Sequence, residues 1–194
     1  MFRLRLAVVA LLGVMLATGT AVANERFGNF IVRSDHPDLI ELAGPIDDKS
    51  VGDFHRALAA QPGAKVILLK SPGGYVDEAL KIAAEVRKLG LNTAIPRSGG
   101  CYSACTYLFF AGREHVVRGK LGVHQVSEDG YAPGTAYDGD VRAALRRYGT
   151  PTAVIQAMAA TPSSDLHIFS AREISKYALN RCAQGSKTAL YAER

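Results

Sequence analysis

Runs of apolar residues recur along the first half of this chain at the spacing expected of buried strands. Residues 66–69 (Val-Ile-Leu-Leu) are unbroken by any polar residue, which predicts a parallel strand buried on both faces. Residues 39–42 predict a shorter strand that ends at a Gly-Pro turn, and residues 91–95 predict the next strand. The pattern therefore indicates a sheet with buried central strands.

Two helical patterns separate these strands. Apolar residues recur at helical spacing between residues 51 and 58, and a Gln-Pro-Gly run at 61–63 ends that pattern. Residues 76–89 form a longer amphipathic pattern, with Gly90 at the position that commonly follows the end of a helix. Strand, helix and strand in succession predict a right-handed crossover and an α/β layered domain.

The second half of the chain has shorter elements. An apolar helix is predicted up to Gly112, and its start follows a Gly-Gly pair at 99–100. The remaining predictions are short strands at 116–117 and 121–124, a loop at 127–138, helices at 139–147 and 151–160, a helix that starts near Ser170, and a frayed polar tail at 184–194.

Composition narrows the class of protein. The chain has 194 residues, 48% of them hydrophobic and 21% charged, with a mean hydropathy of +0.05, which excludes a wholly disordered chain and suits a single domain. The absence of Trp and an aromatic content of 8% argue against a surface that stacks nucleic-acid bases. We therefore expect a globular domain without a nucleic-acid partner.

The first 23 residues have the pattern of an export signal. Arg3 and Arg5 precede an apolar run over residues 6–17, and Ala21-Val22-Ala23 matches a small-x-small cleavage site. An uncleaved anchor is the alternative, but the apolar run is short for a membrane span. We expect cleavage after Ala23 and a periplasmic or secreted protein. Beyond this segment no run of Lys and Arg suggests a lipid or DNA patch.

Ser71-Pro72-Gly73-Gly74 lies at the end of the buried strand and leads into the long helix. Consecutive glycines permit positive φ angles and close approach of a ligand, and N–H groups at a helix start favour negative charge. Such a loop is able to form an oxyanion hole. An ordinary strand-to-helix turn is the alternative.

Two further residues carry candidate chemistry. Ser103 follows the second glycine pair at the start of an apolar helix, where it is either an N-cap or a nucleophile with the Ala104 N–H as an oxyanion donor. His124 ends a short apolar strand and is followed by Gln125; a lone histidine there is either structural or a general base.

The ordered set of these motifs resembles the ClpP-like branch of the ClpP/crotonase fold, over roughly residues 39–179. The resemblance implies an α/β domain of repeated β-β-α units, assigned here to residues 24–183. It also implies that Gly74 is an oxyanion donor, that Ser103 is the nucleophile and that His124 is the base. Homo-oligomers are common in this fold, so a homo-oligomer is expected.

The sequence departs from the family pattern in the connection from Gly112 to His124, which is shorter, and at two further places. Cys105 replaces the small residue that the protease carries two positions after its serine. The acid of the triad is expected at Asp165, which falls about one residue out of register, and Asp138 and Asp140 are the alternatives.

A lysine is the alternative base, because some relatives of this fold use a serine and a lysine. Lys120 is the candidate, but it precedes the strand that delivers His124 and is expected at a solvated surface position. His115 and His167 are expected to be structural or exposed. The Ser-His arrangement is therefore favoured.

The three cysteines leave several pairings open in an oxidising compartment. Cys182 bonded to Cys101 or to Cys105 would tie the last helix to the segment of Ser103. A bond between Cys101 and Cys105 requires Cα atoms within about 7 Å. A cysteine nucleophile with His124 is a minor alternative, because the resemblance puts the serine in that place. A zinc site is another, since no His or Asp lies at ligand spacing around the cysteines.

The sequence thus predicts an exported serine hydrolase, peptidase-like, acting on a peptide or a small acyl substrate without metal, cofactor or ATPase partner. A catalytically inactive binding or scaffold protein of the cell envelope is the alternative. Acyl-CoA chemistry fits poorly, because CoA thioesters are not expected outside the cytoplasm.

Overall fold

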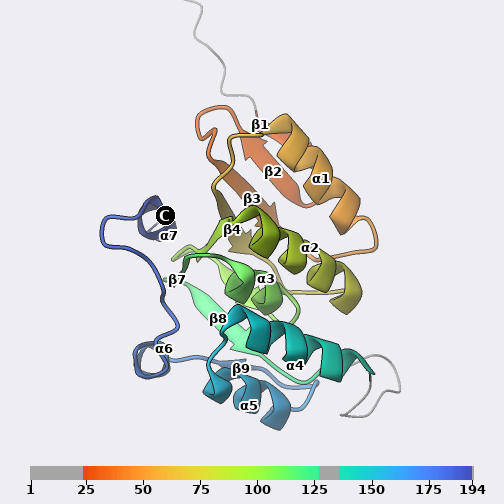
Figure 1. Cartoon of the computed structure of the whole chain (residues 1–194), viewed down its shortest axis with the longest axis vertical. Coiled ribbons are helices and arrows are strands. Elements are labelled where there is room, and N and C mark those ends of the chain that lie inside the picture. The colour runs from red at the N-terminus through yellow and green to blue at the C-terminus, as the bar shows by residue number, and fades with distance from the viewer. Residues whose placement is uncertain (1–23, 127–135, 194) are drawn as a thin grey trace, which may run out of the picture.

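The computed structural model describes residues 24–126 and 136–193 of the chain (Figure 1). The predicted signal segment and most of the predicted loop at 127–138 lie outside the described residues. Residues 136–138 already belong to a helix, so the loop ends earlier than its composition suggested.

A six-stranded sheet forms the centre of the fold, in the order β1-β2-β3-β4-β5-β7. β1 and β2 form an antiparallel hairpin that the sequence pattern did not predict, and β3, β4, β5 and β7 are parallel. The strands are β1 Asn24–Phe27, β2 Phe30–Arg33, β3 Leu39–Ala43, β4 Val66–Lys70, β5 Asn92–Ile95 and β7 His115–Val117.

Both faces of this sheet are covered, as the apolar run of β4 predicted. Ile67 and Leu69 face the larger core beneath the helices α1 (Ser50–Ala60), α2 (Val76–Leu89) and α3 (Cys105–Ala111), which lie side by side across the sheet (Figure 1). Val66 and Leu68 alternate to the opposite face, where they pack with Ala192 of α7 (Lys187–Ala192). Alternate side chains of one strand therefore enter two separate cores.

A smaller sheet lies against the first, in the order β6-β8-β9. Its strands are β6 Gly100–Tyr102, β8 Lys120–Val123 and β9 His167–Ile168. A parallel bridge between Ser71 and Cys101 links the end of β4 to β6. The helices α4 (Ala136–Tyr148), α5 (Thr152–Ala160) and α6 (Ala171–Lys176) complete this half of the molecule. The two candidate motifs at residues 71–74 and 101–105 thus meet where the sheets adjoin.

The C-terminal segment is ordered against the main sheet, whereas the sequence predicted a frayed tail. Arg181 pairs with His115 through two backbone hydrogen bonds of 2.8 Å, at the edge of β7. The Glu114 carboxylate then accepts hydrogen bonds from the Ser186 and Thr188 hydroxyls. Because α7 covers the second face of the sheet, this segment contributes to the core.

Candidate active site

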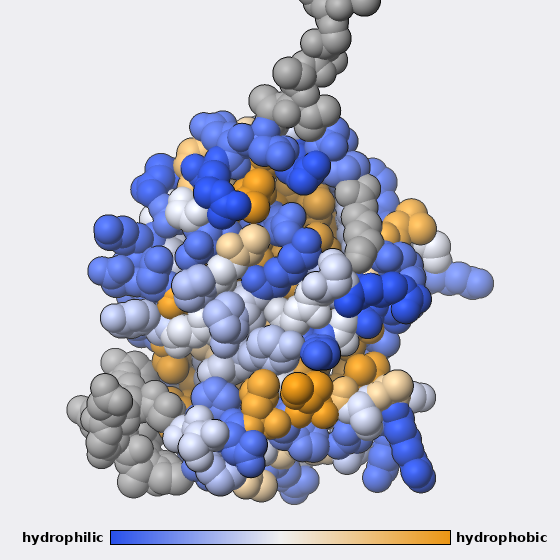
Figure 2. Space-filling view, turned by 180° about the vertical axis from the view of Figure 1, so that it is seen from behind, coloured by the Kyte–Doolittle hydropathy of each residue, from blue (hydrophilic) through white to orange (hydrophobic). Residues whose placement is uncertain are grey.

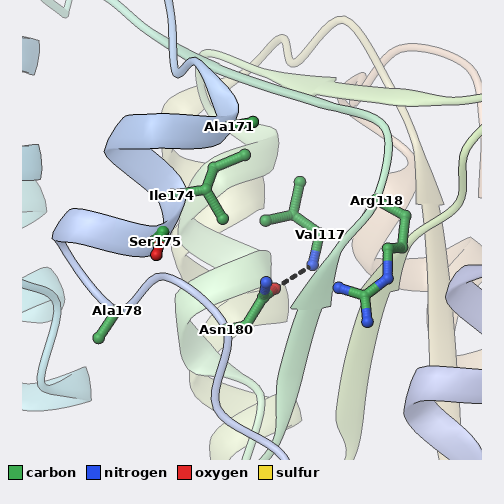
Figure 3. Close-up of a pocket in the computed structure, with 7 residues that line it drawn as sticks. All are labelled: Val117, Arg118, Ala171, Ile174, Ser175, Ala178 and Asn180. Carbon is green, nitrogen blue, oxygen red and sulfur yellow. Dashed lines mark hydrogen bonds between the residues drawn. The ribbon is translucent and has the colours of Figure 1, made fainter.

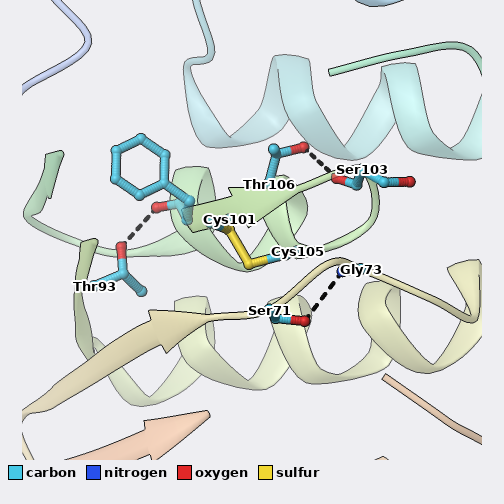
Figure 4. The surroundings of a disulfide bond; sticks show 8 residues. Ser71, Gly73, Thr93, Cys101, Ser103, Cys105 and Thr106 are labelled. Carbon is cyan, nitrogen blue, oxygen red and sulfur yellow. Dashed lines mark hydrogen bonds between the residues drawn. A yellow bond between two sulfur atoms is a disulfide. The ribbon is translucent and has the colours of Figure 1, made fainter. Parts of the chain in front are cut away.

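Ser103 occupies a strained turn between β6 and α3. Its φ angle is +53°, a left-handed conformation that costs a non-glycine residue roughly 1–2 kcal/mol. The turn is fixed on both sides: the Ser103 N–H donates to the Gly122 carbonyl at 3.0 Å, and the Thr106 hydroxyl donates to the Ser103 carbonyl at 2.7 Å. The Ser103 side chain points away from the neighbouring disulfide (Figure 4). Backbone strain of this kind clusters at functional sites.

The glycine loop lies directly against this turn. Gly73 has φ +94°, and a Cβ atom added to it would lie 2.8 Å from Ser103 Cβ and 2.9 Å from the Ala104 nitrogen. Gly74 has φ +145°, and a Cβ there would overlap the Ile46 carbonyl. Both positions therefore require glycine, because a side chain at Gly73 would collide with the serine turn and one at Gly74 would collide with the Ile46 backbone.

Two backbone N–H groups beside the serine are unoccupied. The Gly73 N–H donates to the Ser71 hydroxyl at 3.1 Å within the loop (Figure 4). Neither the Gly74 N–H nor the Ala104 N–H donates a hydrogen bond to an acceptor in the described part of the chain. Gly74 is exposed, so its N–H is available to a bound oxygen atom, whereas Ala104 is fully buried.

A disulfide bond brackets the serine. Cys101 and Cys105 are bonded with their Cα atoms 5.3 Å apart, and both are fully buried (Figure 4). Of the pairings that the sequence left open, the Cys101–Cys105 bond is the one that forms, and the alternative from Cys182 is wrong: Cys182 is an exposed free thiol. It follows Arg181, which pairs with the outer edge of β7, whereas Cys101 and Cys105 lie four residues apart on either side of one turn.

His124 follows β8 and lines a hollow of about 420 Å³ next to the serine turn. Its Nδ1 atom lies 2.6 Å from the carbonyl oxygen of Gln125. The hollow is also lined by Tyr102, which directly precedes Ser103, and by Pro72 of the glycine loop. Its complete lining is Pro72, Tyr102, His124, Ser163, Ser164, Asp165 and Leu166.

Asp165 lines the same hollow but is not bonded to the histidine. Its Oδ1 accepts from the Leu166 N–H at 2.9 Å, and the residue is exposed. Within the described chain, no hydrogen bond joins His124 to Asp165 or to Ser103. The structure thus brings the three predicted residues to one region without connecting them as a hydrogen-bonded triad.

The other acids do not contact the histidine either. Asp138 lies on α4 and accepts from Arg142 Nε at 2.7 Å, one turn along the same helix. Its negative charge adds to the effect of burial, which is the larger cause, in raising the pKa of the Tyr107 hydroxyl. Asp140 is exposed on the same helix.

The remaining basic candidates are placed as the sequence suggested. Lys120 is exposed at the start of β8. His167 pairs with Glu173 at 3.0 Å. His115 is buried against the rings of Phe109 and Phe110, and its burial, with Arg181 nearby, lowers its pKa to about 4.

No role in the site was predicted for Tyr102, Pro72 or the Gln125 carbonyl. Tyr102 precedes Ser103 and Pro72 precedes Gly73, so their positions next to predicted site residues could have indicated that they line the site. The carbonyl contact had no signal, because it depends on the rotamer of the histidine.

A larger hollow of about 490 Å³ lies between β7 and α6 (Figure 3). Ala171 and Ile174 of α6 face Val117 across it, and Asn180 accepts a hydrogen bond of 2.7 Å from the Val117 N–H. Arg118 is the charged residue that lines this hollow. On the side opposite to Figure 1, the surface is mainly hydrophilic with scattered apolar areas (Figure 2). The residues that line the hollow between β7 and α6 include no His, Lys, Asp or Glu that could act as a base for Ser175.

Two kinds of site are absent from the described residues. Residues 24–126 and 136–193 contain no group of three His, Cys, Asp or Glu side chains that could hold a metal ion. None of the helices described is long and apolar enough to cross a membrane.

Solved structures identify the fold. No protein-family model and no curated protein matches the chain. A mutant of the 1510-N membrane-bound stomatin-specific protease superposes with a TM-score of 0.54 at 18% identity, over 77% of this chain and 80% of that one. ClpP1 from Listeria monocytogenes superposes with a TM-score of 0.57 at 14% identity, over 74% of this chain and 89% of that one. The chain therefore has a ClpP-like fold, as its motifs predicted.

Proposed function

We propose that this chain is a serine hydrolase of the peptidase-like kind, with Ser103 as its nucleophile. The observation that carries the proposal is the strained Ser103 turn, packed against a glycine loop beside two unoccupied N–H groups. Helix capping does not account for the strained backbone of Ser103, since Ala104 and not Ser103 is the N-cap of α3. The protease among the solved structures of this fold supports the same activity class.

The proposed reaction has two steps. Ser103 Oγ attacks a substrate carbonyl while Nε2 of His124 takes the hydroxyl proton, and the N–H groups of Gly74 and Ala104 stabilise the oxyanion. The histidine then gives its proton to the leaving group, which departs as the acyl-enzyme forms. Water attacks the acyl-enzyme with the same base, which releases the acid and restores the serine. The expectation from the sequence that Asp165 is the triad acid is untested, and the proposed reaction does not depend on it.

Labelling with a fluorophosphonate probe tests this proposal. We expect the purified protein to be labelled and Ser103→Ala to lose labelling while its melting temperature stays the same or rises. Ser163→Ala is the matched control, because Ser163 lines the same hollow and is exposed. Labelling that persists in Ser103→Ala, or that is absent from folded wild-type protein, contradicts the proposal.

A catalytically inactive binding protein is the second candidate. The observation that favours it is the lack of a hydrogen bond between Ser103 and His124 in the described chain. Hydrogen bonds of this kind often tighten only when substrate binds, so the hydrolase remains our proposal. Folded protein that resists labelling but retains peptide in equilibrium dialysis would favour the binding protein.

We also propose that the protein works in the periplasm or outside the cell. Two features support this: the signal pattern at residues 1–23 and the buried Cys101–Cys105 bond, which is typical of oxidising compartments. Mass spectrometry of the protein purified from its cell fraction should give Asn24 as the first residue. A chain that keeps residues 1–23 contradicts cleavage.

A further inference from the structure

The contact between the His124 ring and the backbone carbonyl of Gln125 determines which ring nitrogen carries a proton. Nδ1 of His124 lies 2.6 Å from the Gln125 carbonyl oxygen, which only accepts hydrogen bonds. The Nδ1 atom must therefore be the donor. A neutral imidazole has one N–H, so Nε2 is left as the acceptor. This is the tautomer that a general base for a serine hydroxyl requires.

Gln125 is held by two carbonyl groups at the C-terminal end of α5. The Gln125 side-chain Nε2 donates to the Ala159 carbonyl at 2.7 Å, and its backbone N–H donates to the Thr161 carbonyl at 2.9 Å. Carbonyl groups at a helix end have no partner within the helix, so both acceptors are available there. The backbone bond fixes the peptide unit between His124 and Gln125, and the side-chain bond fixes the Gln125 side chain. Together they hold Gln125 in place and so restrict the direction of its carbonyl, which belongs to the following peptide unit.

The same position relative to the ring is taken by a carboxylate in a Ser-His-Asp triad. Asp165 is the acidic residue that lines the hollow together with His124. Its carboxylate accepts a hydrogen bond from the Leu166 N–H. Asp138 is paired with Arg142. In the described chain the Nδ1 side of the histidine is thus occupied by a carbonyl group.

We infer that Gln125 is a positioning residue: its side chain anchors the carbonyl that orients His124, in place of a carboxylate. The inference deepens the proposed hydrolase function and rests on it for its catalytic consequence. A neutral carbonyl holds the tautomer as a carboxylate does, but it stabilises the imidazolium less in the transition state. We therefore expect turnover that depends on Gln125 and not on Asp165.

The direct test is the tautomer of His124, measured by two-bond 1H–15N NMR on protein labelled with 15N-histidine at pH 8. His124→Gln assigns the signals. We expect the Nδ1–H tautomer to dominate in wild type and in Asp165→Asn, and to give way to a mixture in Gln125→Ala. Gln156→Ala is the matched control, because Gln156 is an exposed glutamine on the same helix α5.

The second readout is hydrolysis of an activated ester that depends on Ser103. Gln125→Ala should lower kcat roughly tenfold to hundredfold with KM changed less than about threefold, the size expected for a misoriented general base. Asp165→Asn should change kcat less than about threefold. If Gln125→Ala fails to fold, Gln125→Glu is the replacement variant. It keeps the side-chain volume, but its carboxylate cannot donate a hydrogen bond to the Ala159 carbonyl.

Two results overturn the inference. One is an Nε2–H tautomer in wild type; the other is a tautomer that changes in Asp165→Asn and not in the Gln125 variants. If wild type shows no Ser103-dependent hydrolysis, the proposed function fails, and the NMR measurement still decides the inference because it needs no turnover.

Discussion

The two sides of the candidate site are built very differently. On the proposed nucleophile side, the Ser103 turn lies between two fully buried cysteines joined by a disulfide, and Gly73 lies so close to it that a side chain at Gly73 would overlap the turn. On the base side, His124 follows the last residue of β8, and residues 163–165 opposite are exposed. The first is part of the core, whereas the second is a surface loop region held by a few hydrogen bonds.

This difference follows from what each side must do. A strained backbone persists only where its surroundings over-determine it, so the serine turn needs a disulfide, a carbonyl partner and a close glycine. An imidazole must rotate and exchange protons during a reaction, which a few directional hydrogen bonds permit. Substitutions that disturb the packing around the serine turn should therefore cost stability, and those on the base side should chiefly cost rate.

Gly73→Ala should have the largest effect. The added Cβ would lie 2.6 Å from the Tyr102 carbonyl oxygen and 2.8 Å from Ser103 Cβ, at a φ of +94°. We expect a loss of about 3–4 kcal/mol in unfolding free energy and at least about a hundredfold slower probe labelling. Urea unfolding and labelling kinetics measure these. Gly139→Ala in α4, where nothing lies within 4 Å, should instead be neutral or stabilising by up to about 1 kcal/mol. Equal losses in both variants would contradict the comparison.

Acid should weaken the core that supports the serine, through His115. Its pKa is lowered to about 4 in the fold, so between pH 6.5 and about 4 the unfolded chain binds a proton that the native chain does not. Unfolding free energy should therefore fall with falling pH across this window, by about 3 kcal/mol in total. Urea unfolding at a series of pH values measures the slope. His115→Phe keeps a ring beside Phe109 and should flatten it; an unchanged slope would exclude His115 as the cause.

Removal of the disulfide should have a smaller effect on stability. In the chain-entropy model, a loop as short as that from Cys101 to Cys105 stabilises by about 2 kcal/mol. The double variant Cys101→Ala, Cys105→Ala should unfold at lower urea and be labelled more slowly, because the Ser103 turn relaxes. Cys182→Ala should match wild type, since that thiol is free and exposed. A double variant with wild-type labelling would show that hydrogen bonds alone hold the turn.

Lys120→Ala should have the smallest effect. Lys120 is exposed at the start of β8, so its loss should change stability by less than about 0.5 kcal/mol and labelling by less than about twofold. Labelling kinetics at constant pH check this. A loss of labelling comparable with that of His124→Gln would indicate that Lys120, at the start of β8, is the base instead of His124, which follows its end.

The nucleophile side was the more predictable from sequence for a physical reason. The buried strand β4, the glycine loop and the αL residue Gly90 each depend on local backbone chemistry, which residue types reveal. The acid depends on one residue of register in a loop, and the pairing of Cys182 depended on where the tail crosses the sheet. Those are consequences of packing between distant segments, which local patterns do not contain.

The same holds for the ends of the fold. The tail was expected to fray because residues 184–194 are polar. Thr188 is nevertheless fully buried, and its hydroxyl accepts a hydrogen bond of 3.0 Å from the side-chain amide of Asn92. The β1–β2 hairpin pairs with β3, and its four-residue strands were too short to stand out in the sequence. Short elements gain their stability from neighbours and show little of it in their own composition.

The pairing of Arg181 with His115 bears on how copies of this chain behave in concentrated solution. β7 lies at one edge of the six-stranded sheet, and an open edge is a template for strands of other molecules. Here Arg181 and Asn180 occupy the N–H groups of His115 and Val117, so the edge is closed by the chain's own tail. A truncation before residue 180 would expose these groups, and we expect it to aggregate by strand addition while the full chain stays dispersed.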